Sequence, residues 1–124
     1  MLKDLDCCLT ARHYETKEMV YFLESVRAFK ETKRPELRDR NGNFIQQRVR
    51  EAIESPDFVY EDYRIPSSRR CHYKLEYTVN GKSWYVKVVL EYMLNEKCFN
   101  VSTTFRSNAV KERGKTRIVY GNDN

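Results

Sequence analysis

The fold is decided by the stretch from Cys71 to Arg106, which reads CHYKLEYTVNGKSWYVKVVLEYMLNEKCFNVSTTFR. Polar and apolar residues alternate along much of it, which is the period of a β-strand with one buried face. Asn80-Gly81 is a strong signal for a tight hairpin turn, and residues 95–97 mark a second turn. We therefore predict a meander of three antiparallel strands at residues 71–79, 84–94 and 98–106.

The two faces of this meander differ in polarity. One is predicted to be apolar and covered by helices. The other faces outward or into a cleft, and it carries His72, Lys74, Glu76, Lys87, Glu91, Thr104 and Arg106. Acids, bases and hydroxyls cost free energy where they are half solvated, so this face is either a functional site or a wet surface. On a wet surface, Lys74–Glu91 and Glu76–Lys87 are simple cross-strand ion pairs.

Two helices are expected before the meander. The first spans about residues 17–31, with Thr16 as its N-cap and an apolar stripe of Met19, Phe22, Leu23, Val26 and Phe29. The second spans about residues 44–54, with Asn43 as its cap and a buried side of Ile45, Val49, Ala52 and Ile53. For residues 2–13 a helical edge formed by Leu2, Leu5 and Leu9 and an extended conformation both remain open.

Further strands are expected at Phe58–Tyr63, where Glu61-Asp62 favours a sheet edge, and at Thr116–Tyr120. The predicted fold class is α+β, with N-terminal helices packed on one face of a twisted, mostly antiparallel sheet of about four to five strands. The 124 residues form a single domain, with a helical part at about 1–57, a sheet part at about 58–120 and a frayed tail at 121–124.

Positive charge is concentrated in the sheet half of the chain. Residues 64–117 contain 12 Lys or Arg and 4 Asp or Glu, whereas residues 1–63 contain 11 and 13. This distribution suits a polyanion such as RNA or DNA, and it equally suits a solubilising surface. The N-terminus lacks the long apolar core of a signal peptide, so a cytoplasmic location without membrane association is expected. Cys7, Cys8, Cys71 and Cys98 lack metal-site spacing, so we expect free thiols and no metal.

Several short motifs in order give a family resemblance. They are Arg12-His13-Tyr14-Glu15, Ser55-Pro56-Asp57 before Phe58–Asp62, V-K-V-V-L-E-Y at 86–92, V-S-T-T-F-R-S at 101–107, and Arg113-Gly114-Lys115. From Ala11 to Tyr120 the chain resembles phage- and toxin-associated nuclease domains grouped with barnase, EndoU, the nuclease colicins and RelE. Tyr14 and Arg106 stand where that pattern has proline. The resemblance implies helices on a twisted antiparallel sheet and metal-independent RNA cleavage.

RNA cleavage without a metal needs a base for the 2′-hydroxyl, an acid for the departing oxygen and cations for the phosphate charge. His13 or His72 can serve as acid or base, and Glu76 or Glu91 as an alternative base. The predicted catalytic set is His13 as acid/base, Lys87 and Arg106 as phosphate ligands, and Thr104, with Thr103 as alternative, as an auxiliary donor. The expected RNA contacts are Arg69, Arg70, Lys74, Lys111, Arg113 and Lys115.

The sequence thus predicts a toxin-type endoribonuclease that needs no cofactor. Its partners would be RNA, with tRNA and mRNA as candidates, and a cognate inhibitor protein. The alternative is a non-catalytic toxin-like or phage accessory domain that binds nucleic acid or a protein.

Overall fold

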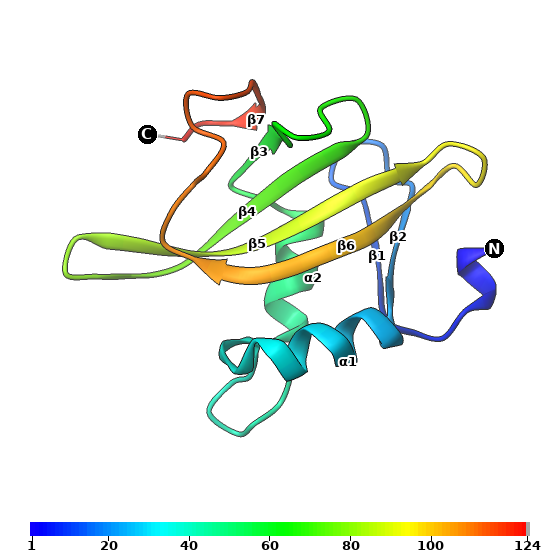
Figure 1. The fold of residues 1–124 in the computed structure, drawn as a ribbon, viewed down its shortest axis with the longest axis horizontal. Coiled ribbons are helices and arrows are strands. Elements are labelled where there is room, and N and C mark those ends of the chain that lie inside the picture. Colours follow the sequence, from blue (N-terminus) through cyan, green and yellow to red (C-terminus); the bar gives the residue numbers. More distant parts are fainter. Residues whose placement is uncertain (124) are drawn as a thin grey trace.

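A computed structural model describes residues 1–123, which form a seven-stranded mixed sheet with two α-helices (Figure 1). The strand order is β1-β2-β6-β5-β4-β3-β7, and every pairing is antiparallel except that of β2 with β6. The strands are β1 (Cys7–Arg12), β2 (Met19–Leu23), β3 (Phe58–Glu61), β4 (Arg69–Val79), β5 (Lys82–Met93), β6 (Cys98–Ser107) and β7 (Ile118–Gly121). The helices are α1 (Glu24–Lys33) and α2 (Gln46–Glu54). The α+β class is confirmed, but the prediction of four to five strands was wrong.

The predicted meander is confirmed. β4 pairs with β5 and β5 pairs with β6, in both cases antiparallel. In the β4–β5 turn, Asn80 and Gly81 have φ of 50° and 76°, the left-handed conformation that two-residue hairpin turns require. β5 is buried at five successive residues, Val86–Leu90. It is therefore the central strand of the sheet, covered on both faces.

The first predicted helix was wrong over its first half. Met19–Leu23 forms β2, and α1 begins only at Glu24, so Thr16 caps no helix and Leu23 is the N-cap residue. Five successive apolar residues satisfy the period of a helix and that of a strand equally well. The strand places Val20 and Phe22 in the core, at 1% and 0% exposure, whereas Phe29 on α1 is 56% exposed.

The structure shows which conformation the N-terminal segment adopts, a question that the sequence left open. Cys7–Arg12 is extended and pairs with β2 through a hairpin whose turn spans residues 13–18. The N-terminal part of the chain therefore supplies two strands as well as the helices, which brings the sheet to seven.

The C-terminal strand changes the position of β3. β7 pairs with β3, so β3 lies between β4 and β7 and is not the predicted edge. Gly121 belongs to β7, and a Cβ there would lie 2.1 Å from the carbonyl oxygen of Asp57, so only glycine fits. Residues 121–123, predicted to fray, have defined contacts: Gly121 is part of β7, and Asp123 accepts a hydrogen bond from the Tyr60 hydroxyl at 2.8 Å. Asn124 lies outside the described residues.

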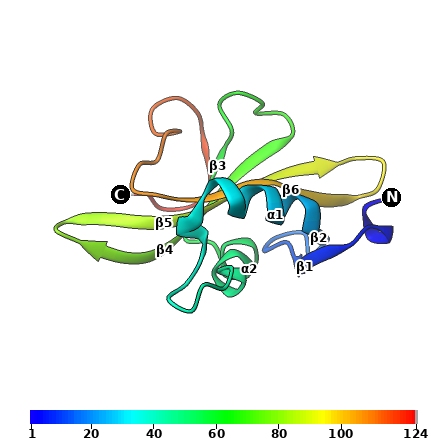
Figure 2. The ribbon, with the colours of Figure 1, turned by 60° about the horizontal axis from the view of Figure 1, so that its bottom comes forward.

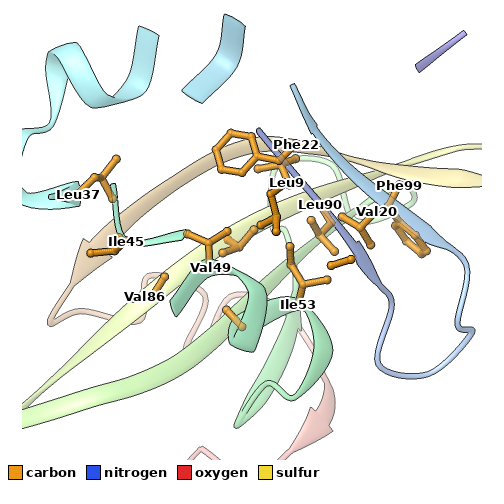
Figure 3. Close-up of a cluster of buried hydrophobic side chains, with 14 residues drawn as sticks. Leu9, Val20, Phe22, Leu37, Ile45, Val49, Ile53, Val86, Leu90 and Phe99 are labelled. Atoms are coloured by element: carbon orange, nitrogen blue, oxygen red, sulfur yellow. The ribbon is translucent and has the colours of Figure 1, made fainter. Parts of the chain in front are cut away.

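Both faces of the sheet are covered, as the edge-on view in Figure 2 shows. We call the face that carries the helices the helix face and the opposite one the loop face. The main core lies on the helix face, between β1, β2, β5, β6 and α2 (Figure 3). A smaller core on the loop face lies under the 108–117 segment and consists of Phe58, Tyr60, Cys71, Tyr73, Val89 and Val110.

The predicted single polar face does not exist, because its residues lie on both faces. His72 pairs with Val88 and Val88 with Thr104, which places all three on the helix face. Lys87 pairs with Tyr73 and Phe105 and therefore lies on the loop face. Irregular pairing after Leu75 in β4 and around Ser102 in β6 changes which residues share a face.

The two helices are short, with ten and nine residues. α2 begins at Gln46, two residues later than predicted, and Asn43 does not cap it. Its predicted buried residues, Val49, Ala52 and Ile53, are all fully buried. Among residues 1–123, no helix is long and apolar enough to cross a membrane.

β2 pairs with β6 over a short distance only. The two strands pair at Val20–Phe99 and Tyr21–Asn100. Along the rest of β6, no strand of the described chain pairs with this edge, and α1 continues from β2 beside it (Figure 1). The Arg34 guanidinium lies 4.8 Å from the centre of the Phe105 ring. A helix thus covers an edge that β2 leaves open.

Phe22 and Phe29 test the corrected boundary between strand and helix. We expect Phe22→Ala to lower the free energy of unfolding by about 3–5 kcal/mol, because it empties a fully buried site. Phe29→Ala is the matched control, with an expected change of about 0.5 kcal/mol or less. Urea unfolding followed by circular dichroism measures both. Equal losses would indicate the single helical stripe and contradict the strand.

Candidate functional site

The four residues predicted for catalysis do not share one site. His13 lies in the β1–β2 turn, and Thr104 and Arg106 lie on the helix face of β6. Lys87 lies on the loop face of β5. The structure instead places His13, Lys87 and Arg106 at three different pockets, and Thr104 lines none of these three.

His13 caps the β1–β2 turn. Its Nδ1 accepts hydrogen bonds from the backbone N–H groups of Glu15 and Thr16, both at 3.2 Å, so the neutral ring carries its proton on Nε2. The residue is 5% exposed, and its ring stacks on Phe99 with 4.3 Å between centroids. Burial lowers the pKa of His13, although the carboxylates of Glu15 and Glu18 oppose this shift. The imidazole is therefore a neutral hydrogen-bond donor at pH 7.

A cleft of about 460 Å³ opens beside this imidazole. We call it the His13 cleft. It combines rings on which a base can stack with hydroxyls, two arginines and two carboxylates. It is lined by His13, Tyr14, Glu15, Thr16, Glu18, Ser67, Ser68, Arg70, Tyr92, Phe99, Arg117 and Val119.

The charged side chains of the His13 cleft are held by specific contacts. Arg70 donates hydrogen bonds to the backbone oxygens of Pro66 and Arg69, at 2.7 and 2.9 Å, and lies 3.9 Å from the Glu61 carboxylate. Arg117 is largely exposed and lies 3.4 Å from Glu61. Glu18 accepts a hydrogen bond from the Tyr92 hydroxyl at 2.8 Å. The cleft thus offers cations for a phosphate and a carboxylate that can accept a proton.

His72 lies behind the cleft and is fully buried. Its Nδ1 donates to the backbone oxygen of Ala52 at 3.0 Å, and its Nε2 has no partner among the described residues. The ring lies 5.6 Å from that of His13, in a T-shaped arrangement. Burial, reinforced by His13, lowers the pKa of His72 to about 3. His72 is therefore a neutral core residue that a substrate does not reach.

Lys87 is buried on the opposite face, at 3% exposure. Its Nζ lies 3.0 Å from Glu112, and Glu112 also accepts a hydrogen bond from the Tyr73 hydroxyl at 2.6 Å. The ammonium also lies 5.4 Å from the Tyr73 ring centre and 5.3 Å from that of Phe105. Removing a charge from water is costly unless it is paired, so Glu112 is the group that permits this lysine in the interior.

A second cleft lies over this buried pair. We call it the basic cleft, because cations form most of its polar wall. It is lined by Lys30, Arg34, Asp62, Tyr63, Arg64, Arg69, Lys87, Ser102, Thr103, Phe105, Lys111 and Glu112. It brings Lys87 together with two of the predicted RNA contacts, Arg69 and Lys111, but it contains no histidine.

The remaining predicted residues have internal partners. The Thr104 hydroxyl donates to the backbone oxygen of Lys87 at 2.9 Å, within the sheet. Arg106 binds Glu76 at 2.7 Å, and Lys74 donates to the backbone oxygen of Ser55 at 2.8 Å. Arg106 and Glu76 also line a further pocket of about 620 Å³, whereas Thr104 and Lys74 line neither this pocket nor the two clefts.

The outer predicted contacts lie elsewhere. Arg113 pairs with Asp123, and Lys115 lies 4.7 Å from the centre of the Tyr63 ring. Glu91, considered above as a base, pairs with Arg69 at 2.8 Å. The proposed Lys74–Glu91 and Glu76–Lys87 pairs are absent from the ion pairs of the described residues.

Sequence reasoning missed several residues of both clefts. The missed members are Glu18, Ser67, Ser68, Tyr92 and Arg117 in the His13 cleft, and Lys30, Arg34 and Arg64 in the basic cleft. Lys30 and Arg34 are four residues apart at the end of α1, a spacing that marks one side of a helix. That spacing was visible in the sequence, whereas the strand that α1 approaches was not.

Comparisons of the chain with protein-family models, with curated proteins and with solved structures found no match. The site must therefore be interpreted from its own geometry. The four cysteines are free, and residues 1–123 contain no cluster of three or more His, Cys, Asp or Glu side chains suited to a metal ion.

The buried pair gives a test by double substitution. We expect Lys87→Met alone to lower the free energy of unfolding by about 3–5 kcal/mol, because it leaves Glu112 charged and unpaired. The double variant Lys87→Met/Glu112→Gln should lose clearly less than the sum of the two single variants, since no buried charge remains. Urea unfolding of the four proteins measures the coupling. Additive losses would contradict a buried ion pair.

His72 predicts how stability depends on pH. Its pKa is about 3 in the folded chain and about 6.5 in the unfolded chain, so only the unfolded chain takes up the proton between these values. Stability is complete above about pH 6.5 and falls as the pH decreases towards 3. Between about pH 7 and 5, protonation of His72 in the unfolded chain should lower the free energy of unfolding by about 2 kcal/mol. Urea unfolding of the parent and of His72→Gln at several pH values measures this loss. An identical dependence of the free energy of unfolding on pH in both proteins would contradict it.

Proposed function

We propose that this protein binds RNA and cleaves it in the His13 cleft without a metal ion. The observation that carries the proposal is the grouping of a buried imidazole, two arginines, a carboxylate and stacking rings around one cavity. These are the groups that attack by a ribose 2′-hydroxyl on the adjacent phosphate requires. The family resemblance to toxin-type ribonucleases, which rests on residues 11–120, supports the same activity.

The proposed roles differ from those expected from sequence. The Nε2–H of His13 donates a hydrogen bond to a phosphate oxygen, because Nδ1 is occupied by the turn. A neutral histidine with a lowered pKa can act as such an electrophile. Arg70 and Arg117 bind the phosphate and stabilise the charge that develops on it.

Glu18 is the proposed base. It takes the proton from the 2′-hydroxyl, the 2′ oxygen forms a bond to phosphorus, and the bond from phosphorus to the 5′ oxygen breaks. The proton held by Glu18 then returns to the 5′ oxygen. The products are a 2′,3′-cyclic phosphate and a 5′-hydroxyl, and the proposed reaction uses no cofactor.

The second candidate is a non-catalytic domain that binds nucleic acid. One specific observation favours it: Lys87, Thr104 and Arg106 each have an internal partner, and only His13 of the predicted catalytic set lines the His13 cleft. In that case the two clefts would bind RNA without changing it.

Cleavage assays with matched variants separate these functions. The parent should cleave RNA in EDTA and leave 2′,3′-cyclic phosphate ends. His13→Asn keeps an oxygen that can accept the turn's N–H groups but removes the imidazole donor, and we expect a loss of about 10²–10³-fold in kcat. Glu18→Gln keeps a partner for Tyr92, with an expected loss of about 10²–10⁴-fold.

Lys82→Gln, at an exposed position outside both clefts, is the control and should retain full activity. Binding of RNA without cleavage by the parent would favour the non-catalytic domain. Activity that disappears in EDTA, or full activity of both cleft variants, would contradict the proposed mechanism.

A further inference from the structure

The basic cleft contains more positive side chains than carboxylates that could neutralise them. Its two carboxylates, Asp62 and Glu112, are each 1% exposed, and they are bound by Arg64 and by Lys87, respectively. Within residues 1–123, Lys30, Arg34 and Lys111 form no ion pair; the Arg34 guanidinium lies 4.8 Å from the centre of the Phe105 ring and the Lys30 ammonium 5.7 Å from that of Phe29. These three cations have no carboxylate partner in the described chain and are therefore available to bind an anion from another molecule.

Two neutral groups in the cleft suit a nucleic acid strand. Thr103 lines the cleft, and its hydroxyl is buried without a hydrogen-bond partner in the described chain, so a phosphate oxygen would reach it only after the side chain rotates. The Tyr63 ring is 38% exposed at the rim, with the Lys115 ammonium 4.7 Å from its centre. An exposed ring among cations is the combination with which proteins bind single strands.

The two clefts share one wall, the connection between β3 and β4. Tyr63 and Arg64 of this connection line the basic cleft, and Ser67 and Ser68 line the His13 cleft. At the start of β4, Arg69 lies on the loop face and lines the basic cleft, whereas Arg70 lies on the helix face and lines the His13 cleft. Successive residues of a strand point to opposite faces, so adjacent arginines serve both clefts.

We propose that one RNA strand occupies both clefts, with its cleaved phosphate in the His13 cleft and its neighbouring phosphates in the basic cleft. The strand crosses the residue 63–68 connection, and Lys30, Arg34 and Lys111 bind its backbone on the loop face. This inference rests on the proposed function for the position of the cleaved bond. The phosphate-binding role of the basic cleft stands on its own charges.

Binding and cleavage by a charge-neutralised variant test the proposal. Arg34→Gln/Lys111→Gln removes two cations of the basic cleft, and Lys3→Gln/Lys82→Gln removes the same charge from exposed positions outside both clefts. Fluorescence anisotropy measures binding of 2′-O-methyl RNA of about twelve and about three nucleotides, which cannot be cleaved. The measurements run from about 50 to 200 mM salt.

For the longer RNA, log K falls as log salt rises. In the cleft variant this negative slope should be smaller in magnitude by about 1.4, or about 0.7 for each lost phosphate contact. The short RNA cannot occupy both clefts at once, so its affinity should differ less between the parent and the cleft variant than that of the longer RNA. If the parent cleaves RNA, KM for a long substrate should rise in the cleft variant while kcat remains unchanged.

The outcomes separate the two proposals. Equal slopes for the cleft variant and the control would overturn the basic cleft as a phosphate site, whether or not RNA is cleaved. Reduced slopes with no cleavage by the parent would overturn the ribonuclease and retain the RNA site. Fluorescent polyglutamate is measured in the same anisotropy assay. If the cleft variant keeps RNA binding but loses polyglutamate binding, the proposal is overturned in favour of an acidic protein as the ligand.

Discussion

The central strand β5 imposes the constraint on which the rest of the structure depends. Val86–Leu90 is buried on both faces, so the chain has to place one layer on each side of the sheet. α2 covers one face and the 108–117 segment covers the other, while α1 lies beside the edge of β6. The His13 cleft lies on the first face and the basic cleft on the second.

Lys87 shows how one residue can link stability and a binding surface. It interrupts the apolar run of β5, and its charge is compensated by Glu112 from the 108–117 segment. The Tyr73 hydroxyl completes this contact from β4. The buried pair therefore attaches the outer layer to the sheet. It also forms the floor of the basic cleft, which Lys111, the residue before Glu112, lines as well.

The local signals in the sequence predicted the local parts of the fold. Asn80-Gly81 and the alternation around it were enough for the meander, because a hairpin is determined by neighbouring residues. Met19–Leu23 could not be assigned, since an apolar run of five fits both periods and its parallel partner, β6, lies about eighty residues away. The irregular pairing around Ser102 has no sequence signature, so the faces of β6 could not be predicted. The basic half of the chain was evident in the sequence and His13 was predicted as a site residue, but how these residues are distributed between the two faces depends on the long-range pairings.

The short contact between β2 and β6 has a consequence for the behaviour of the protein at high concentration. An unpaired strand edge presents backbone donors and acceptors that can recruit a strand from another molecule. Beyond Asn100, α1 lies beside that edge of β6. The change from strand to helix at Glu24 therefore places α1 where a strand from another molecule would otherwise add to β6. It opposes aggregation through this edge of the sheet.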